Sequence, residues 1–473
     1  MSSFHSILTR RDFMKGLGLG TAGVSAATVA VPLFHDLDEM MASEGSDSTN
    51  FEEKLPWYVK RREYGNPTVE VDWNALQRWH GKYNNDSAHL TPAHYKQRVA
   101  QQFVDRKNNI LANRAGFTLR DYGLNYTGFA WPTHTVGSTN TPESLGVPKW
   151  EGTPEQNARM LRAVARWAGG SMCEFFELDE KYQKLIPMID GDARKPIIFE
   201  DVPQEYINSK NEWVWPIKFK YGMVCMIPRE LELMRRSPSG FARSSVGKGY
   251  DQGFILDYRI QTFLRNIGYD AVAFSSQSVP FSVMSGIGEL VRMNVASPPA
   301  YGPMTSIGHV YFTDLPLPAS RPVDAGMLRF CKQCIKCAEI CPAESSFSKE
   351  MGEPAWDITA TNNPAGKPDN LKPELFNNFG KRIWPFNQFA CKSYWMTLGC
   401  ASCTACSGSC VFSKERLSSI HELVKPILAT TPVMNNFFYK MDSLFSYGRL
   451  PMCEWDNWWD EDKAYRAPVM GYR

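Results

Sequence analysis

Apolar residues recur at helical spacing in two stretches in the middle of the chain. The first begins at the capping-box sequence Thr153-Pro154-Glu155-Gln156 and continues to Gly169-Gly170. The second covers residues 251–267 and is followed by Gly268, a residue type that commonly ends helices. Both stretches are therefore predicted to be amphipathic helices that cover an apolar layer.

Three short apolar runs, at residues 196–199, 221–227 and 270–274, are predicted to be strands. The second run is apolar without alternation, which is typical of a strand buried on both faces. Helices and strands thus alternate over residues 151–322, and this alternation favours an α/β or an α+β domain. The proline-rich sequence Leu315-Pro316-Leu317-Pro318 predicts a linker at the end of that domain.

The composition is that of a soluble globular protein. The 473 residues include 52 basic and 50 acidic ones, so the formal net charge is +2. This balance argues against a nucleic-acid-binding surface spread over the whole chain, and no nucleic-acid partner is expected. Aromatic residues make up 13% of the chain, and they serve either ordinary core packing or the wall of a large apolar pocket.

The N-terminus has the layout of a twin-arginine export signal. Arg10 and Arg11 precede an uncharged segment rich in glycine and alanine that extends to Phe34. The glycines of this segment disfavour the alternative, a transmembrane anchor. A signal over residues 1–42 predicts export in the folded state, typically with a cofactor already bound. Small residues that suit cleavage occur near positions 30 and 42.

Eight of the 12 cysteines fall in two runs of identical spacing. The first is Cys331-x2-Cys334-x2-Cys337-x3-Cys341-Pro342, and the second is Cys400-x2-Cys403-x2-Cys406-x3-Cys410. In bacterial ferredoxins three cysteines of such a run bind one [4Fe-4S] cluster and the fourth binds the other cluster. The pair of runs therefore predicts two [4Fe-4S] clusters, and it disfavours zinc ribbons and disulfides.

The ferredoxin pattern also predicts which cysteines share a cluster. One cluster is assigned to Cys331, Cys334, Cys337 and Cys410, and the other to Cys341, Cys403, Cys406 and one further cysteine. The spacing nominates Cys400 as that further ligand, but Cys391 lies only a loop away, so both stay open. The isolated cysteines Cys173, Cys225 and Cys453 are predicted to be buried small hydrophobes. Clusters transfer single electrons, so another cofactor is expected to carry out the bond chemistry.

Taken together, these features resemble the corrinoid-dependent reductive dehalogenases of organohalide respiration. The resemblance rests on the export signal, the segments 286–293 and 312–317, and the two ferredoxin runs in that order. It implies an α+β fold in which a nitroreductase-like cobamide-binding domain precedes a ferredoxin-like domain with two [4Fe-4S] clusters. The implied boundaries are an irregular aromatic unit that contributes to the pocket (43–150), the cobamide-binding core (151–322), the ferredoxin-type domain (323–415) and a C-terminal extension (416–473).

The resemblance also implies roles for individual residues. The family's proton donor corresponds to Tyr250, which is expected just before the second predicted helix, where the helix dipole favours a phenolate. The corrinoid is expected without a protein axial ligand, since no histidine lies in an Asp-x-His-x-x-Gly motif. The residues expected to contact the corrinoid are Tyr250, Gly247, Gly249, Ser276 and Gln277. Trp395 is expected to line the substrate pocket.

At two positions the chain departs from the family pattern. A loop with the sequence Ser275-Ser276-Gln277 stands where relatives place an asparagine, and Ser306 stands where many place an arginine. Without that arginine, a positive charge is expected from Lys248, Arg243 or His309. The alternative is a site that relies on the helix dipole and hydrogen bonds.

The family also implies a location and partners. The enzyme is expected on the outer face of the cytoplasmic membrane, peripheral, held by a small integral-membrane anchor protein and supplied by a membrane electron donor. Its expected substrate is a small organohalide such as a chlorinated ethene, whose halogen is replaced by hydrogen in anaerobic respiration. The competing classes are a tRNA-acting cobamide reductase of the epoxyqueuosine type, which the export signal disfavours, and a non-catalytic two-cluster electron carrier, which would leave roughly 300 residues without a task.

Overall fold

The computed structural model describes residues 51–52, 55–79, 92–119, 121, 141–190, 195–274, 277–343, 349–350, 352–357, 378–384, 386, 390–392, 394, 403–414 and 419–460. The predicted export signal, Ser276, Trp395 and Cys400 lie outside these residues. Within them, no helix is long and apolar enough to cross a membrane.

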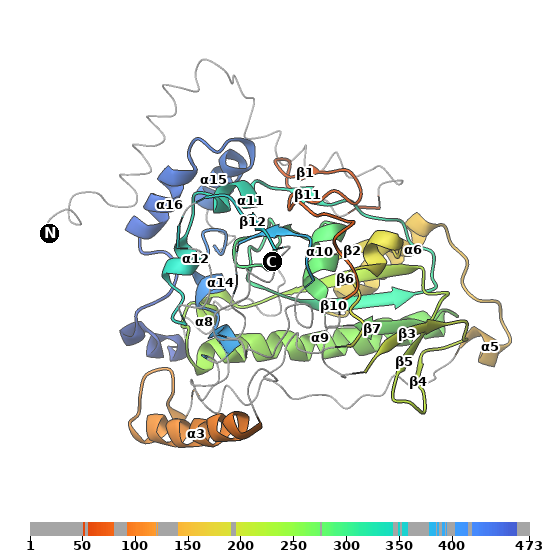
Figure 1. Cartoon of the computed structure of the whole chain (residues 1–473), viewed down its shortest axis with the longest axis horizontal. Coiled ribbons are helices and arrows are strands. Elements are labelled where there is room, and N and C mark those ends of the chain that lie inside the picture. The colour runs from red at the N-terminus through yellow and green to blue at the C-terminus, as the bar shows by residue number, and fades with distance from the viewer. Residues whose placement is uncertain are drawn as a thin grey trace, which may run out of the picture.

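A four-stranded sheet with the order β2-β6-β10-β7 forms the centre of the molecule (Figure 1). Its strands are β2 (Met172–Glu177), β6 (Tyr221–Pro228), β10 (Thr305–Thr313) and β7 (Ala271–Phe274), and every neighbouring pair is antiparallel. The antiparallel pairing decides between the two predicted fold classes, because an α/β domain would have a parallel sheet. The fold is α+β.

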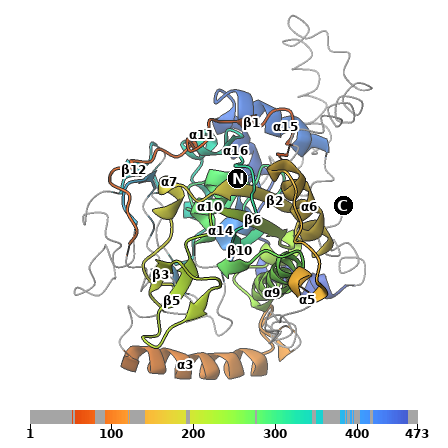
Figure 2. The same cartoon turned by 90° about the vertical axis from the view of Figure 1, so that its right-hand side faces the viewer.

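Helices cover both faces of this sheet. On one face lie α6 (Pro154–Trp167) and α9 (Gly240–Asn266), and on the other lies α10 (Ser278–Ser285) (Figure 2). Side chains of β6 alternate between the two layers, with Met223 and Cys225 in the core beneath α9 and Val224 and Met226 in the opposite core. Both layers are apolar, which explains why β6 is apolar without a gap.

The sequence prediction for α6 is confirmed in detail. The backbone N–H of Thr153 donates to Gln156 Oε1 at 2.9 Å, and Thr153 Oγ1 accepts from the backbone N–H of Gln156 at 3.3 Å. The helix ends before Gly169, which has a φ of +103°. The local signals at both ends of this helix thus place it correctly.

Helix α9 begins at Gly240, so its predicted start at residue 251 is wrong. Ser239 caps it, since Ser239 Oγ accepts from the backbone N–H of Ala242 at 3.5 Å. Gly247 and Gly249 are both buried within this helix. Glycine disfavours a helix by about 1 kcal/mol per residue, and the packing of α9 on the sheet outweighs this cost. Tyr250 therefore lies inside the helix and not at its N-terminus.

The cysteine-bearing segments gather on one side of the sheet (Figure 1). They include α11 (Met327–Cys331), α12 (Lys336–Glu339) and α14 (Ala405–Ser409), and the tail helices α15 (Ser419–Thr430) and α16 (Asn435–Leu444) pack nearby. The short helix α8 (Leu231–Met234) contacts both α14 and α9. The cysteine region therefore adjoins the beginning of α9.

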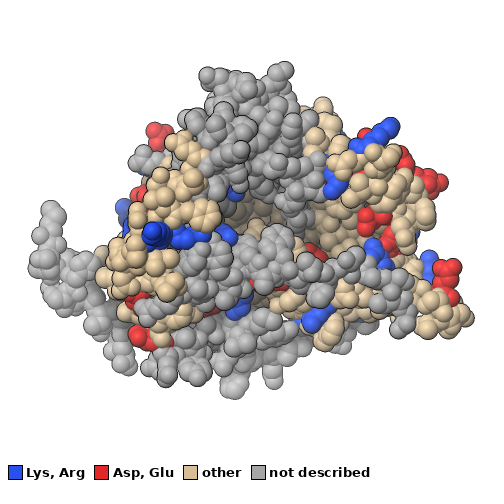
Figure 3. Space-filling view, turned by 90° about the horizontal axis from the view of Figure 1, so that it is seen from below, with Lys and Arg blue, Asp and Glu red and all other residues tan. Residues whose placement is uncertain are grey.

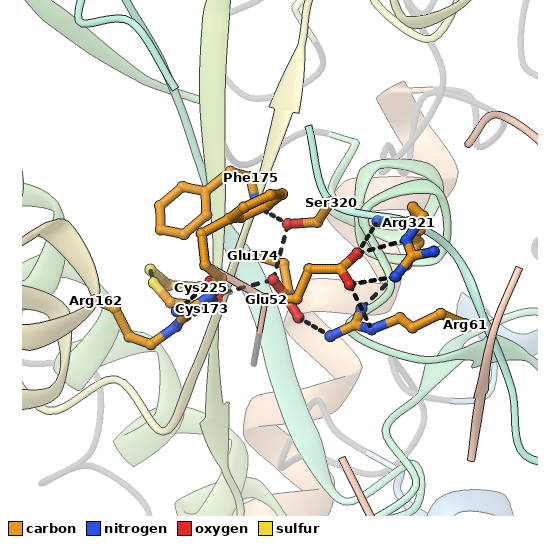
Figure 4. A network of polar contacts seen from close by, with 10 residues as sticks. Glu52, Arg61, Arg162, Cys173, Glu174, Phe175, Cys225, Ser320 and Arg321 are labelled. Atoms are coloured by element: carbon orange, nitrogen blue, oxygen red, sulfur yellow. Dashed lines mark hydrogen bonds and ion pairs between the residues drawn. The ribbon is translucent and has the colours of Figure 1, made fainter. Parts of the chain in front are cut away.

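The N-terminal segment is fixed to the sheet by buried ion pairs. β1 (Lys60–Arg61) pairs with β11 (Val323–Asp324), and Glu174 of β2 accepts from Arg61 at 2.6 Å and from Arg162 at 3.3 Å (Figure 4). The Glu174 side chain is fully buried, so each arginine compensates a charge that water cannot reach. Residues 51–52 and 55–61 thus pack directly on the central domain.

The remaining elements are short or peripheral. They are α3 (Pro92–Leu111), α5 (Pro142–Leu145), α7 (Glu180–Gln183), β3 (Ile197–Glu200), β4 (Tyr206–Ile207), β5 (Trp213–Pro216), β8 (Glu289–Leu290), β9 (Ala296–Ser297), β12 (Ala355–Trp356), β13 (Arg382–Ile383), η4 (Met452–Glu454) and η5 (Asp456–Trp459). Strands β3, β5 and β4 form a separate sheet beside the core that contains α10.

Candidate functional site

The structure brings together the four cysteines that were assigned to one cluster. Cys331, Cys334, Cys337 and Cys410 are all buried, and they line one small cavity. The rest of its wall is mainly apolar and includes Phe330, Val411 and Phe412. Burial raises the pKa of Cys410 to about 11 and that of Cys334 to about 12, so these thiols stay protonated unless a cation takes the place of the proton.

Among the residues that the structure describes, no three Cys, His, Asp or Glu side chains converge closely enough to hold one metal ion. The same four cysteines line one cavity with a largely apolar wall, and four cysteine thiolates are the ligand set that holds a [4Fe-4S] cluster. The residues present therefore fit the predicted group.

A buried carboxylate positions the loop that carries the first of these cysteines. Glu289 accepts hydrogen bonds from the backbone N–H groups of Ala325 at 2.7 Å, Met327 at 3.0 Å and Leu328 at 3.4 Å. These bonds occupy free donors at the beginning of α11, the helix that ends at Cys331. Burial raises the pKa of Glu289, while the hydrogen bonds from Met327 and Ala325 act in the opposite direction.

A second group of cysteines lies next to α8 and the start of α9. Burial raises the pKa of Cys406, and the charges of Cys403, Cys391 and Cys341 raise it further. Ser237 Oγ is 3.6 Å from Cys403 Sγ, just ahead of α9. The structure thus places Cys391 among the second group, whereas Cys400 lies outside the described residues.

Tyr250 projects from the middle of α9 and is 40% exposed. The Arg229 guanidinium carbon lies 5.9 Å from the centroid of its ring. Burial lowers the pKa of Arg229, and the charge of Tyr250 and a hydrogen bond with it act in the opposite direction. Because the influence of the helix dipole falls off within the first turn, the expected dipole effect on Tyr250 is wrong, and the charged group that lies beside its ring is Arg229.

Sequence reasoning did not consider Arg229. It follows directly after β6, and its backbone N–H donates to Met304 O at 2.7 Å, where β6 pairs with β10. Ser306, the position of the family's arginine, lies opposite Ile227 in the same register. The charge beside Tyr250 therefore comes from Arg229, which follows the neighbouring strand β6 and lies two residues after Ile227 in the sequence.

His309, one of the three residues expected to supply this charge, faces another group. Its Nδ1 lies 3.1 Å from Asp257 Oδ1, and Tyr311 donates its hydroxyl to the same oxygen at 2.6 Å. The His309 ring fills the space beside Gly253, where an added Cβ would lie 1.8 Å from its Cε1. The other two expected residues, Lys248 and Arg243, are part of α9.

The remaining described residues of the predicted corrinoid site lie in α9 and at the start of α10. Gly247 and Gly249 are inside α9, and Gln277 is half-buried at the residue before α10. Their contacts with a corrinoid stay predictions. Of the isolated cysteines, Cys173 and Cys225 are buried as predicted and lie opposite each other on β2 and β6, with their sulfurs 2.7 Å apart. The prediction for Cys453 is wrong, because this residue is exposed on a short turn of the tail.

The surface around the described residues carries charges of both signs. In the view from below, Lys and Arg are interspersed with Asp and Glu, and the surface is hollowed near the middle of that face (Figure 3). This interspersed pattern agrees with the nearly balanced count of 52 basic and 50 acidic residues.

Known proteins resemble this chain along its whole length. A family profile described as reductive dehalogenase subunit matches residues 130–317. A chloroethene reductive dehalogenase from Dehalococcoides mccartyi strain VS is 30% identical, and the match covers 100% of this chain and 99% of the relative. A trichloroethene reductive dehalogenase from Dehalococcoides mccartyi strain ATCC BAA-2266 is 25% identical over 98% of both chains.

A solved structure supports the fold. The catabolic reductive dehalogenase NpRdhA matches with a TM-score of 0.56 and 19% identity, over 82% of this chain and 49% of that chain. The present chain thus spans about half the length of that protein. The full-length match at 30% identity confirms the family that the sequence motifs indicated: the chain belongs to the reductive dehalogenases, oxidoreductases that act on carbon–halogen bonds.

Proposed function

We propose that this protein replaces a chlorine of a small chlorinated hydrocarbon, such as a chlorinated ethene, by hydrogen. Each chloride released consumes two electrons and one proton. The observation that carries the proposal is that Tyr250 projects from α9 beside Arg229, the residue that follows β6, while the cysteine region adjoins the beginning of this same helix. The substrate class is supported by the relatives, which are named for chloroethene and trichloroethene.

Two [4Fe-4S] clusters are the proposed electron relay. Cys331, Cys334, Cys337 and Cys410 would hold the first, since they line one apolar cavity. Cys341, Cys403 and Cys406 would hold the second cluster together with Cys391. The support for Cys391 is that its charge, like those of Cys403 and Cys341, raises the pKa of Cys406. Cys400 is the alternative fourth ligand.

A corrinoid is the proposed cofactor for bond cleavage, in line with a solved relative whose title describes B12-dependent dehalogenation. When bound, its low-valent cobalt supplies the electrons that break the carbon–halogen bond. Among the described residues, Arg229 Nε and His309 Nε2 are buried without a hydrogen-bond partner, so the site fits a cofactor with peripheral carboxamides. Further proposed contacts are Tyr250, Gly247, Gly249, Ser276 and Gln277, with no protein axial ligand, and Trp395 is proposed for the substrate pocket.

Tyr250 is the proposed proton donor. A proton leaves its hydroxyl oxygen as the new carbon–hydrogen bond forms, and the oxygen becomes negatively charged. Arg229 stabilises this charge, since its guanidinium lies beside the ring and a hydrogen bond joins the two side chains. The exposed part of Tyr250 allows a proton from solvent to restore the hydroxyl.

Export by the twin-arginine route is part of the proposal. The signal over residues 1–42 supports a location on the outer face of the cytoplasmic membrane, where an anchor protein would hold the enzyme and a membrane donor would supply electrons. Arg10→Lys combined with Arg11→Lys should leave unprocessed precursor in the cytoplasm, because the exporter recognises the arginine pair. Immunoblotting of cell fractions checks this, and normal processing of the variant would rule out this route.

The proposed substrate and cofactors are tested together on purified protein. Two clusters imply about eight iron atoms per chain, and cofactor extraction should yield a corrinoid absorption spectrum. The loaded enzyme is then offered trichloroethene and, separately, 3-bromo-4-hydroxybenzoic acid, the compound bound to a solved relative. Chloride release from trichloroethene supports the proposal, bromide release alone would contradict the substrate class, and no halide release would contradict the function.

A further inference from the structure

A buried arginine lies against the cavity of the first cysteine group. Arg292 is fully buried and donates through Nε and Nη2 to the backbone carbonyl of Cys331, at 3.1 Å and 2.7 Å. Its guanidinium carbon lies 4.5 Å from the centroid of the Trp384 ring, which holds the side chain in place. Burial lowers the pKa of Arg292, and the nearby sulfurs of Cys331, Cys337 and Cys334 act in the opposite direction.

Two buried lysines lie near the same four sulfurs. Lys336, between Cys334 and Cys337 in the sequence, forms a short ion pair with Asp442. Lys414 Nζ is 2.5 Å from the other carboxylate oxygen of Asp442 and lies 4.5 Å from the Tyr447 ring centroid. The lysine side chains are 11% and 9% exposed and that of Asp442 is 5% exposed, so water screens their charges little.

The charges of these groups do not cancel. Arg292, Lys336 and Lys414 are three cations, and Asp442 is the one carboxylate paired with the two lysines. The sum is two positive charges near the first cysteine group. The charge of Lys414 reaches Cys410, where it acts against the effect of burial on the thiol pKa, as does the charge of Lys336. We define Arg292, Lys336, Lys414 and Asp442 as the charge shell.

We propose that the charge shell raises the reduction potential of a cluster held by Cys331, Cys334, Cys337 and Cys410. Four thiolates and an oxidised [4Fe-4S] core carry two negative charges in total, and reduction adds a third. Buried positive charge stabilises the reduced state more than the oxidised state, because the reduced state is more negative. The charge shell thereby makes this cluster easier to reduce. An electron that enters the protein is then more stable on this cluster than it would be without the shell.

This inference rests on the clusters proposed above, so its test measures a potential and not the activity. Lys414→Met removes one buried charge and keeps most of the side-chain volume. The reduced-to-oxidised ratio of this cluster at a fixed applied potential should fall at least tenfold, a shift of about 59 mV for a one-electron couple. A redox titration of the loaded enzyme followed by low-temperature EPR gives the midpoint potential of each cluster.

Two matched variants separate charge from packing. Lys414→Arg keeps the positive charge, so the midpoint potential should stay close to that of the wild type. Lys332→Met removes a lysine adjacent to Cys331 in sequence, but this side chain is 36% exposed and paired with Glu353 at 2.7 Å, so a much smaller shift is expected. Arg292→Met gives an independent neutralisation if the Lys414 variant fails to fold.

The outcomes are distinct. The charge shell is supported if Lys414→Met or Arg292→Met lowers the midpoint potential while the iron content stays at the wild-type level. Lys414→Arg should then have the midpoint potential of the wild type. Clusters that are present with unchanged potentials in both neutralising variants would overturn the inference while leaving the proposed function intact. A wild-type protein that binds no iron at these cysteines would overturn both.

Discussion

Replacement of Arg229 tests whether a cation assists proton transfer from Tyr250. Arg229→Met keeps a long side chain beside the ring and removes the charge. The variant should release chloride from a chlorinated ethene more slowly, because the negative charge that forms on the Tyr250 oxygen loses the guanidinium beside the ring. The iron content should stay at the wild-type level, since the cysteine groups are held by other residues. The rate is compared per bound corrinoid, because Arg229 is also part of the proposed corrinoid site.

The expected size of the effect follows from the geometry. The guanidinium carbon lies 5.9 Å from the ring centroid, and unit charges separated by about 6 Å interact by about 2.8 kcal/mol at an effective dielectric constant of about 20. Tyr250 is 40% exposed, and solvent screening at such a site reduces the interaction to about 1 kcal/mol. The chloride-release rate should therefore fall roughly 5- to 10-fold.

A double-mutant cycle shows whether Arg229 acts through Tyr250. Tyr250→Phe alone should lower the rate of chloride release by about 100- to 10,000-fold, as expected for loss of a general acid. In that background Arg229→Met should have little further effect. Arg259→Met serves as control, because Arg259 stacks at 4.8 Å on Trp167, which is 70% exposed. If Arg229→Met lowers the rate of chloride release by the same factor in the wild-type and Tyr250→Phe backgrounds, Arg229 does not act through Tyr250.

Further predictions concern stability and the clusters. Glu174→Gln should lower the free energy of unfolding by about 3 kcal/mol, because two buried arginines lose their shared carboxylate; thermal denaturation that matches the wild type would contradict this. Cys391→Ser should remove or convert one cluster, as seen in EPR spectra and iron content, whereas Cys400→Ser should keep both, and the reverse pattern would make Cys400 the ligand. Burial raises the pKa of Glu52, but hydrogen bonding and charge from Arg321 and a neighbouring arginine outweigh it and hold the pKa below its ordinary value near 4.5. The stability from this pair is thus present above that value and is lost as the pH falls through the lowered pKa. The melting temperature of Glu52→Gln should therefore fall less steeply with decreasing pH than that of the wild type, and equal pH dependence of the two melting temperatures would exclude a contribution from Glu52.

Features set by neighbouring residues could be predicted from the sequence. The capping box of α6 joins residues three positions apart, and the observed bonds between Thr153 and Gln156 are those the motif predicts. The apolar run of β6 also predicted a buried strand, because its consecutive apolar side chains alternate between two apolar layers. The start of α9 could not be predicted, because Gly247 and Gly249 weaken the local helix signal and the packing that compensates involves distant strands.

The candidate site shows the same division. The spacing of the first cysteine run predicted which cysteines lie together, since three of the four cysteines that line the cavity are within one short stretch of sequence. The pairing of Arg229 with Tyr250 depends on how α9 packs near the end of β6, which no local pattern encodes. His309 was expected to supply the charge because nothing in the sequence shows that Asp257 lies across from it.

The most direct test of the account is the stoichiometry of electrons, chloride and solvent hydrogen in a turnover of trichloroethene by the cofactor-loaded enzyme. In D₂O the account predicts one chloride released for every two electrons consumed, with one deuterium on the carbon that lost chlorine. Mass spectrometry of the product and chloride analysis measure both quantities. Electron consumption without chloride release, or a product that carries no solvent deuterium, would contradict reductive dehalogenation with proton delivery by this site.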